Sequence, residues 1–165
     1  MTMNRTGSAE VTLPSDTEIM IVRRFDAPAD LVFDVWTTPE HVRNWWGWET
    51  DQMRVCEIDL RVGGTYRFVA GQDDREVAFS GVYREIERPN RLVASEVYEP
   101  YPESESLNTL TLEEDDGVTT MTILVSHRTT EARDATVASG MERGLQHSLD
   151  RVDRVLVAEL EKAHN

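Results

Sequence analysis

Cysteine and long hydrophobic runs are nearly absent from this sequence. Cys56 is the only cysteine among 165 residues, which excludes an intrachain disulfide and a thiolate-rich metal site within one copy. No apolar run approaches the roughly 20 residues of a membrane-spanning helix, so a membrane protein is not expected. The opening residues also lack the apolar stretch behind basic residues that marks a signal peptide. These absences favour a cytoplasmic location.

Basic residues are scarce compared with acidic ones. The 17 Lys and Arg residues face 31 Asp and Glu residues, and the formal net charge is −14. A protein of this charge repels phosphate backbones and anionic lipid head groups. We therefore expect neither nucleic acid nor a membrane as a partner, and the acidic excess is interpreted as a solvated surface.

Motifs of catalysis and of cofactor or metal binding are missing as well. The sequence contains no GxSxG, HExxH, GxxxxGK[ST], GxGxxG or CxxC pattern. Its four histidines do not show the spacing of metal ligands. We therefore assign no catalytic residue, and we expect neither a metal nor a cofactor.

The beginning of the chain predicts a tail, a strand and two short helices. Residues 1–16 carry little apolar periodicity and predict a flexible tail before one domain over 17–163. Alternating apolar residues predict a strand that ends at Phe25. Apolar residues at helical spacing then follow Pro28 and Pro39, each in a position suited to a helix start.

The remainder predicts a meander of strands followed by one long helix. Turn residues separate short β-type segments, and such short connections imply antiparallel neighbours. After residue 131 the apolar spacing is helical, so the α+β arrangement should wrap a curved sheet of about seven strands around one terminal helix. The six predicted strands of the meander cover 52–58, 64–70, 75–87, 91–98, 106–114 and 118–127.

Aromatic residues recur at alternate positions of these strands. Tyr66 and Phe68 share one face of their strand, and Phe79 and Tyr83 share parity on the next. With residues of the short helices and the last strand they predict an apolar surface facing the long helix, although each one alone is more simply explained as core. The candidate lining residues from these elements are Trp36, Trp45, Trp46, Tyr66, Phe68, Phe79, Tyr83, Met121, Ile123 and His127.

Two glycines on the predicted helix suggest that space is left beside it. Gly140 and Gly144 lie one turn apart, although each costs a helix roughly 1 kcal/mol relative to alanine. Either close backbone packing or a bound molecule can use this space, and the sequence leaves both open. The candidate lining residues on the helix are Met141, Gly144, Leu145 and Leu149.

Several separated motifs resemble the START-type helix-grip superfamily, also called SRPBCC or Bet v-like. Within it, the chain is similar to the homologues of the activator of heat-shock-protein ATPase. The resemblance covers residues 17–162, and its motifs fold the chain rather than catalyse a reaction. They lie at 24–28, 32–40 and 45–47, at 59–68 with its D-x-R-x-G-G pattern, at 81–86 with 89–92, and at 140–144 with 148–151.

The resemblance implies a helix-grip fold with a hydrophobic pocket between sheet and helix. The expected partner is a small hydrophobic molecule of lipid-like, aromatic or polyketide-like character, bound without catalysis, and a homodimer is left open. A cyclase or aromatase is one alternative, and it needs a pocket acid and base such as His127 with Glu57 or Tyr83. A chaperone-binding stress-response regulator is the other, implied only by the family name.

Overall fold

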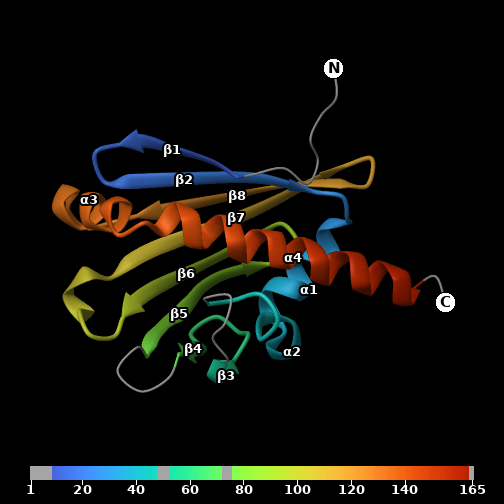
Figure 1. The fold of residues 1–165 in the computed structure, drawn as a ribbon, viewed down its shortest axis with the longest axis horizontal. Helices are drawn as coiled ribbons and strands as arrows, with labels where there is room; N and C mark the ends of the chain where they lie inside the picture. The colour runs from blue at the N-terminus through green and yellow to red at the C-terminus, as the bar shows by residue number, and fades with distance from the viewer. Residues whose placement is uncertain (1–8, 48–52, 72–75, 164–165) are drawn as a thin grey trace.

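Eight strands form one antiparallel sheet in the order β1-β2-β8-β7-β6-β5-β4-β3 (Figure 1). The computed structural model describes residues 9–47, 53–71 and 76–163. Every neighbouring pair in the sheet is antiparallel, and all connections from β3 to β8 are short. The strands are β1 (Glu10–Ser15), β2 (Glu18–Phe25), β3 (Met53–Ile58), β4 (Thr65–Ala70), β5 (Val77–Glu87), β6 (Arg91–Tyr98), β7 (Ser106–Asp115) and β8 (Val118–Ser126).

The longest helix, α4, lies across one face of this sheet (Figure 1). It buries Leu149, Val152 and Leu156, which recur at three- and four-residue spacing and so share one side of the helix. Helix α1 packs against α4 and against the β7 and β8 strands. The helices are α1 (Ala29–Thr37), α2 (Pro39–Val42), the 3-10 turn η2 (Pro102–Ser104), α3 (Thr130–Ala138) and α4 (Met141–Ala163).

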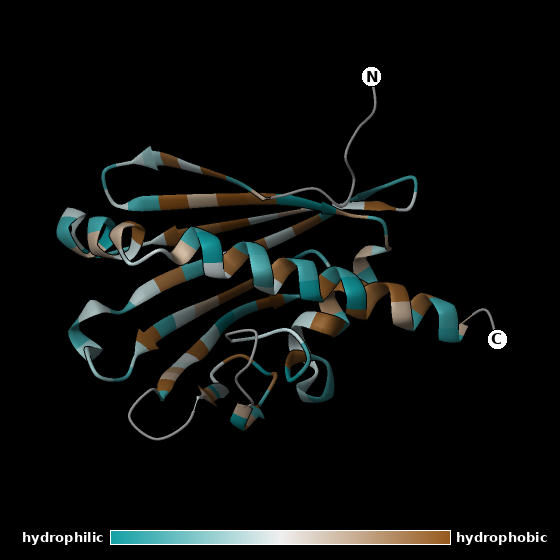
Figure 2. Cartoon of the chain, in the orientation of Figure 1, coloured by the Kyte–Doolittle hydropathy of each residue, from teal (hydrophilic) through white to brown (hydrophobic). Residues whose placement is uncertain are grey.

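The fold is the α+β helix-grip arrangement that the sequence predicts. All six strands of the meander form within one or two residues of their predicted limits, and both short helices follow β2. Apolar residues alternate with polar ones along the strands, which turns one side of the sheet toward α4 (Figure 2). Positions 52 and 75, with which two predicted strands begin, lie outside the described residues.

The prediction of a flexible tail over residues 1–16 is wrong for its second half. Residues Glu10–Ser15 form β1, which pairs with β2 and adds an eighth strand to the sheet. The preceding Ala9 is buried, and its backbone exchanges two hydrogen bonds of 2.8 Å with the Gln146 side chain on α4. Backbone pairing needs no apolar periodicity, and the tail prediction relied on that periodicity. Residues 1–8 lie outside the described part.

Deleting residues 1–15 should therefore destabilise the protein. The deletion removes the β1 ladder and both bonds to Gln146, and each net hydrogen bond contributes on the order of 1 kcal/mol. We expect the free energy of unfolding to fall by about 2 kcal/mol or more in urea titration. Gln146→Leu, which removes only the contact with Ala9, should cost about half as much. An unchanged unfolding midpoint for the deletion would contradict this role of β1.

The predicted single helix after residue 131 is interrupted. Helix α3 begins after Thr129, whose side chain accepts a hydrogen bond from the Ala132 backbone, and ends before Gly140. Gly140 has a positive φ of 83°, the left-handed conformation with which glycine commonly ends a helix. Helix α4 starts at the next residue. Gly140 thus divides the predicted helix in two, and only Gly144 lies within a helix.

Candidate functional site

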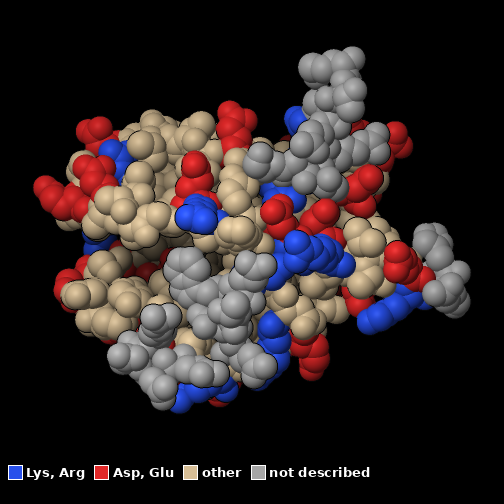
Figure 3. Space-filling model, viewed as in Figure 1, with Lys and Arg blue, Asp and Glu red and all other residues tan. Residues whose placement is uncertain are grey.

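A large cavity lies between the sheet and the two C-terminal helices. Its volume is about 970 Å³, and Figure 3 shows a hollow in the surface between α3 and β6. Cavities that hold small molecules usually measure roughly 300–1,000 Å³. The inward-facing residues of β6 that line this cavity are Leu92, Ala94, Glu96 and Tyr98. Their spacing of two residues is that of one face of a strand.

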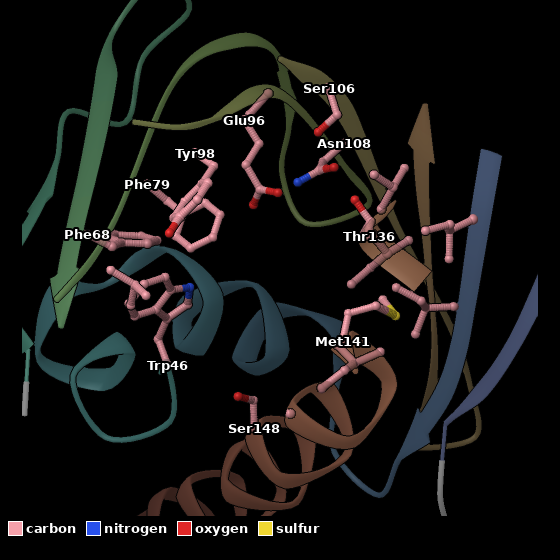
Figure 4. Close-up of a pocket in the computed structure, with 18 of the residues that line it drawn as sticks. Trp46, Phe68, Phe79, Glu96, Tyr98, Ser106, Asn108, Thr136, Met141 and Ser148 are labelled. Carbon is pink, nitrogen blue, oxygen red and sulfur yellow. The ribbon is translucent and has the colours of Figure 1, made fainter. Parts of the chain in front are cut away.

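One side of the cavity is an aromatic wall made of Trp46, Phe68, Phe79 and Tyr98 (Figure 4). Trp46 packs on Phe68 and Phe79 with ring centroids 5.3 and 5.7 Å apart, and Phe79 packs on Tyr98 at 5.2 Å. Register explains the arrangement, because Phe68 pairs with Phe79 across β4 and β5, and Phe79 with Tyr98 across β5 and β6. Tilted ring pairs at these distances are mutually favourable.

Trp36 on α1 and Trp45, which follows α2, also line the cavity. Their ring centroids are 4.4 Å apart. The indole N–H of Trp45 donates a 2.9 Å hydrogen bond to the Val35 carbonyl, which fixes the buried ring against α1. Both rings are therefore held by α1 rather than by the sheet.

Tyr66 and Tyr83 line the cavity from strands β4 and β5. Both are buried, and the Tyr66 hydroxyl donates a 2.7 Å hydrogen bond to the Ser95 carbonyl. Burial raises the pKa of both phenols above their ordinary value. The Tyr66 side chain passes over Gly81 on the neighbouring strand β5 to reach Ser95 on β6. An added Cβ at Gly81 would lie 1.9 Å from the Ser95 carbonyl oxygen, so the absence of a side chain there leaves room for Tyr66.

Glu96 is an acidic side chain within this largely apolar cavity. Glu96 is half-buried, and burial raises the pKa of its carboxyl above the usual range, although the Asn108 amide donates a hydrogen bond to it. Asn108 lies on the neighbouring strand β7, opposite Ala94, so its amide nitrogen reaches Glu96 diagonally (Figure 4). The Asn108 Oδ1 atom is buried and has no hydrogen-bond partner in the described part of the chain.

His127 borders the same cavity directly after β8. Its backbone N–H donates to the Thr17 carbonyl at 2.9 Å, whereas both ring nitrogens are buried and find no partner among the described residues. Burial, with a smaller contribution from Arg133, lowers the pKa of the imidazole. The lowered pKa favours the neutral ring, which has one donor and one acceptor nitrogen.

The structure brings thirteen of the fourteen predicted lining residues to the cavity. Met121 is the exception, because it is fully buried in the core and does not line the cavity. Glu57, named as a possible catalytic acid, is exposed on β3 and also lies away from it. The thirteen are Trp36, Trp45, Trp46, Tyr66, Phe68, Phe79, Tyr83, Ile123, His127, Met141, Gly144, Leu145 and Leu149.

Comparison with protein-family models assigns the chain to a family. The model described as activator of Hsp90 ATPase homolog 1-like protein matches residues 26–157. The chain belongs to this family. No curated protein matches it.

Solved structures similar to this family member come from several bacteria. A Rhodobacter sphaeroides protein superposes with a TM-score of 0.85 at 28% identity, covering 91% of this chain and 99% of that chain. A Mycobacterium smegmatis protein gives 0.81 at 23% identity, covering 91% and 97%. CalU16 of Micromonospora echinospora gives 0.61 at 28% identity, covering 86% and 82%. These similarities establish the fold.

The D-x-R-x-G-G motif of this family member forms the turn between β3 and β4. Gly63 has a positive φ of 86°, and its N–H donates to the Tyr83 carbonyl at 2.8 Å. A Cβ at Gly64 would lie 2.1 Å from the Asp59 carbonyl oxygen, so a side chain cannot be placed there without moving the backbone. The Arg61 guanidinium donates to the Asp59 carboxylate at 2.8 Å. The motif therefore shapes a turn and does not line the cavity.

Within residues 9–47, 53–71 and 76–163, no group of three or more His, Cys, Asp or Glu side chains could hold a metal ion. None of the described helices combines the length and hydropathy that a membrane span requires.

Proposed function

We propose that the protein binds a small, largely apolar molecule in the cavity between the sheet and α4, without needing to transform it. The single observation that supports this proposal is the cavity itself, with its volume of about 970 Å³ and its aromatic wall. Protein interiors are close-packed and leave few voids larger than a water molecule. A cavity of this size is therefore a built feature, and an apolar occupant would gain the free energy of leaving water.

Filling the cavity from the helix side should weaken this binding. Leu145 is half-buried on α4 and lines the cavity, so Leu145→Trp places an indole in the space that a ligand would use. We expect the affinity for the neutral dye Nile red, measured by its fluorescence, to fall about tenfold or more, equivalent to about 1.4 kcal/mol. Because Trp36, Trp45 and Trp46 line the cavity, tryptophan emission of the wild type should also respond to the dye.

Val157→Trp is the matched control for this experiment. Val157 is 50% exposed on the same helix and does not line the cavity, so the same kind of ring is added outside it. This variant should bind Nile red as the wild type does. Equal affinities of Leu145→Trp and Val157→Trp would place dye binding elsewhere and remove the support for the cavity as the site.

Acid–base catalysis on a bound molecule is a second candidate function. One observation favours it: Glu96 and His127 line the same cavity, and each of these side-chain types can donate or accept a proton. A molecule that coelutes with the protein in native mass spectrometry can be incubated with wild type and with Glu96→Gln. A change of its mass with the wild type alone would support catalysis, and an unchanged mass with both would leave binding as the function.

A further inference from the structure

The acidic residues Glu96 and Glu103 line the cavity, and the lowered pKa of His127 disfavours its cationic form. Among the described residues that line the cavity there is no lysine and no arginine. No ion pair of Glu96 is found in the described part of the chain. An anionic ligand, such as a fatty acid or a phosphate, would thus meet carboxyl groups without a compensating cation.

The Glu96 carboxyl group is the charged acceptor that the inner part of the cavity presents to a ligand (Figure 4). The Asn108 amide nitrogen donates to this carboxyl, whereas the Asn108 Oδ1 atom is buried away from the cavity. An ionised carboxylate has about four lone-pair sites, so one amide donor leaves room for others. A ligand that brings N–H donors can therefore bond to Glu96.

We propose that the cavity selects molecules that carry a protonated amine on an apolar body, with the amine nitrogen against the Glu96 carboxylate. This inference rests on the proposed binding function and names the chemical class of the ligand. An alkylammonium group has up to three N–H donors in a compact head, which suits the two oxygens of a carboxylate. It also supplies the positive charge that the buried Glu96 carboxyl lacks, and so stabilises the ionised carboxylate.

The surroundings of Glu96 favour the same chemistry. The Phe79 and Tyr98 rings of the aromatic wall lie on one side of Glu96, and Met141 lies on the other side of the cavity (Figure 4). Aromatic faces attract cations, and the wall provides an apolar surface for the remainder of the ligand. Tyr66 lies close enough for the Glu96 charge to contribute to the raised pKa of its phenol. A cation at Glu96 would relieve that interaction too.

Three probes that share one apolar chain test this selectivity. Dodecylamine, dodecanol and dodecanoate differ only in the charge and donors of the head group, and each can be titrated against bound Nile red. We expect dodecylamine to bind about tenfold or more tightly than dodecanol, and dodecanoate to bind most weakly. Glu96→Gln should remove the preference for dodecylamine over dodecanol.

Glu113→Gln is the matched control, because it makes the same change of charge at an exposed position on β7 that does not line the cavity. It should keep the full preference for dodecylamine. If Glu96→Gln fails to fold, Asn108→Leu removes the amide donor that stabilises the Glu96 carboxylate and should reduce the preference several-fold. Binding of Nile red and dodecanol without a preference for the amine would overturn this inference alone. No binding of the dye or of any of the three probes would instead overturn the proposed function.

Discussion

Asp150→Ala should lower the free energy of unfolding by about 3 kcal/mol, because it takes away a carboxylate that compensates a buried arginine. The Arg23 side chain on β2 is only 1% exposed, and its Nη1 atom lies 2.9 Å from the Asp150 Oδ1 atom on α4. Removing one partner of a buried ion pair costs about 3–5 kcal/mol when the remaining charge is left uncompensated. We expect the lower end, because Asp150 itself is 52% exposed and Asp153 also interacts with Arg23. Urea unfolding measures the difference.

Glu159→Ala on the same helix is the control for this change. Glu159 pairs at 2.9 Å with Lys162, whose side chain is 75% exposed, so water can replace the lost partner. The stability of this variant should stay close to that of the wild type. A loss equal to that of Asp150→Ala would mean that the cost comes from α4 in general and not from the buried arginine.

The interaction between Arg23 and Asp153 should make the stability of Arg23→Met depend on pH. Burial, and to a lesser extent Asp150 and Asp26, raise the pKa of Asp153, whereas Arg23 lowers it. Removing Arg23 thus raises this pKa further, and a carboxyl with a raised folded-state pKa destabilises the fold at higher pH. The difference in free energy of unfolding between the wild type and Arg23→Met should shrink as the pH falls from neutral toward the ordinary carboxyl pKa of 3.8. A difference independent of pH would contradict this account.

Gly81→Ala should cost about 3 kcal/mol, the upper end of what overpacking usually costs. The added Cβ would lie 1.9 Å from the Ser95 carbonyl oxygen and 2.7 Å from the Tyr66 hydroxyl oxygen. Since the first of these atoms is backbone of β6, the strand or the tyrosine has to move. The 2.7 Å hydrogen bond from Tyr66 to Ser95 is lost in either case. Thermal or urea unfolding should show the loss.

Val82→Ala, one residue further along β5, separates this clash from a general effect on the strand. Val82 is 37% exposed, and its truncation should cost less than about 1 kcal/mol. If Gly81→Ala and Val82→Ala are equally stable, the close approach of Tyr66 to Gly81 does not limit stability.

The sheet could be predicted from the sequence because its pattern is local. Alternation such as that of Ile19 and Ile21, with turn residues between segments, gives strands and their connections directly. Two features could not be predicted, and the reasons are physical. β1 is held by backbone pairing and by Gln146, far along the chain, and the division of the long helix depends on the left-handed backbone of Gly140. Neither feature changes the spacing of apolar residues along the sequence.

The sequence predicted most of the aromatic wall and the polar residue His127, but not Tyr98, Glu96 or Asn108. Glu96 lies within the predicted strand 91–98 but was not recognised as a lining residue. The available signal was its place in the alternation of Leu92, Ala94 and Tyr98, where an acid on an inward face is unusual. Asn108 becomes significant only when β6 and β7 pair. The chaperone-regulator hypothesis stays a prediction, since it rests on the family name.

The two outer strands of the sheet have a consequence for self-association. β1 and β3 are the edges of the sheet, and an exposed edge can template pairing with a second copy. β1 carries Pro14 beside a register shift, and β3 is short, also shifted in register, and carries the exposed charges Arg54 and Glu57. Proline, irregular register and charge all discourage strand addition. A homodimer of this chain is therefore expected to form through another surface, and edge-to-edge aggregation is opposed at both ends of the sheet.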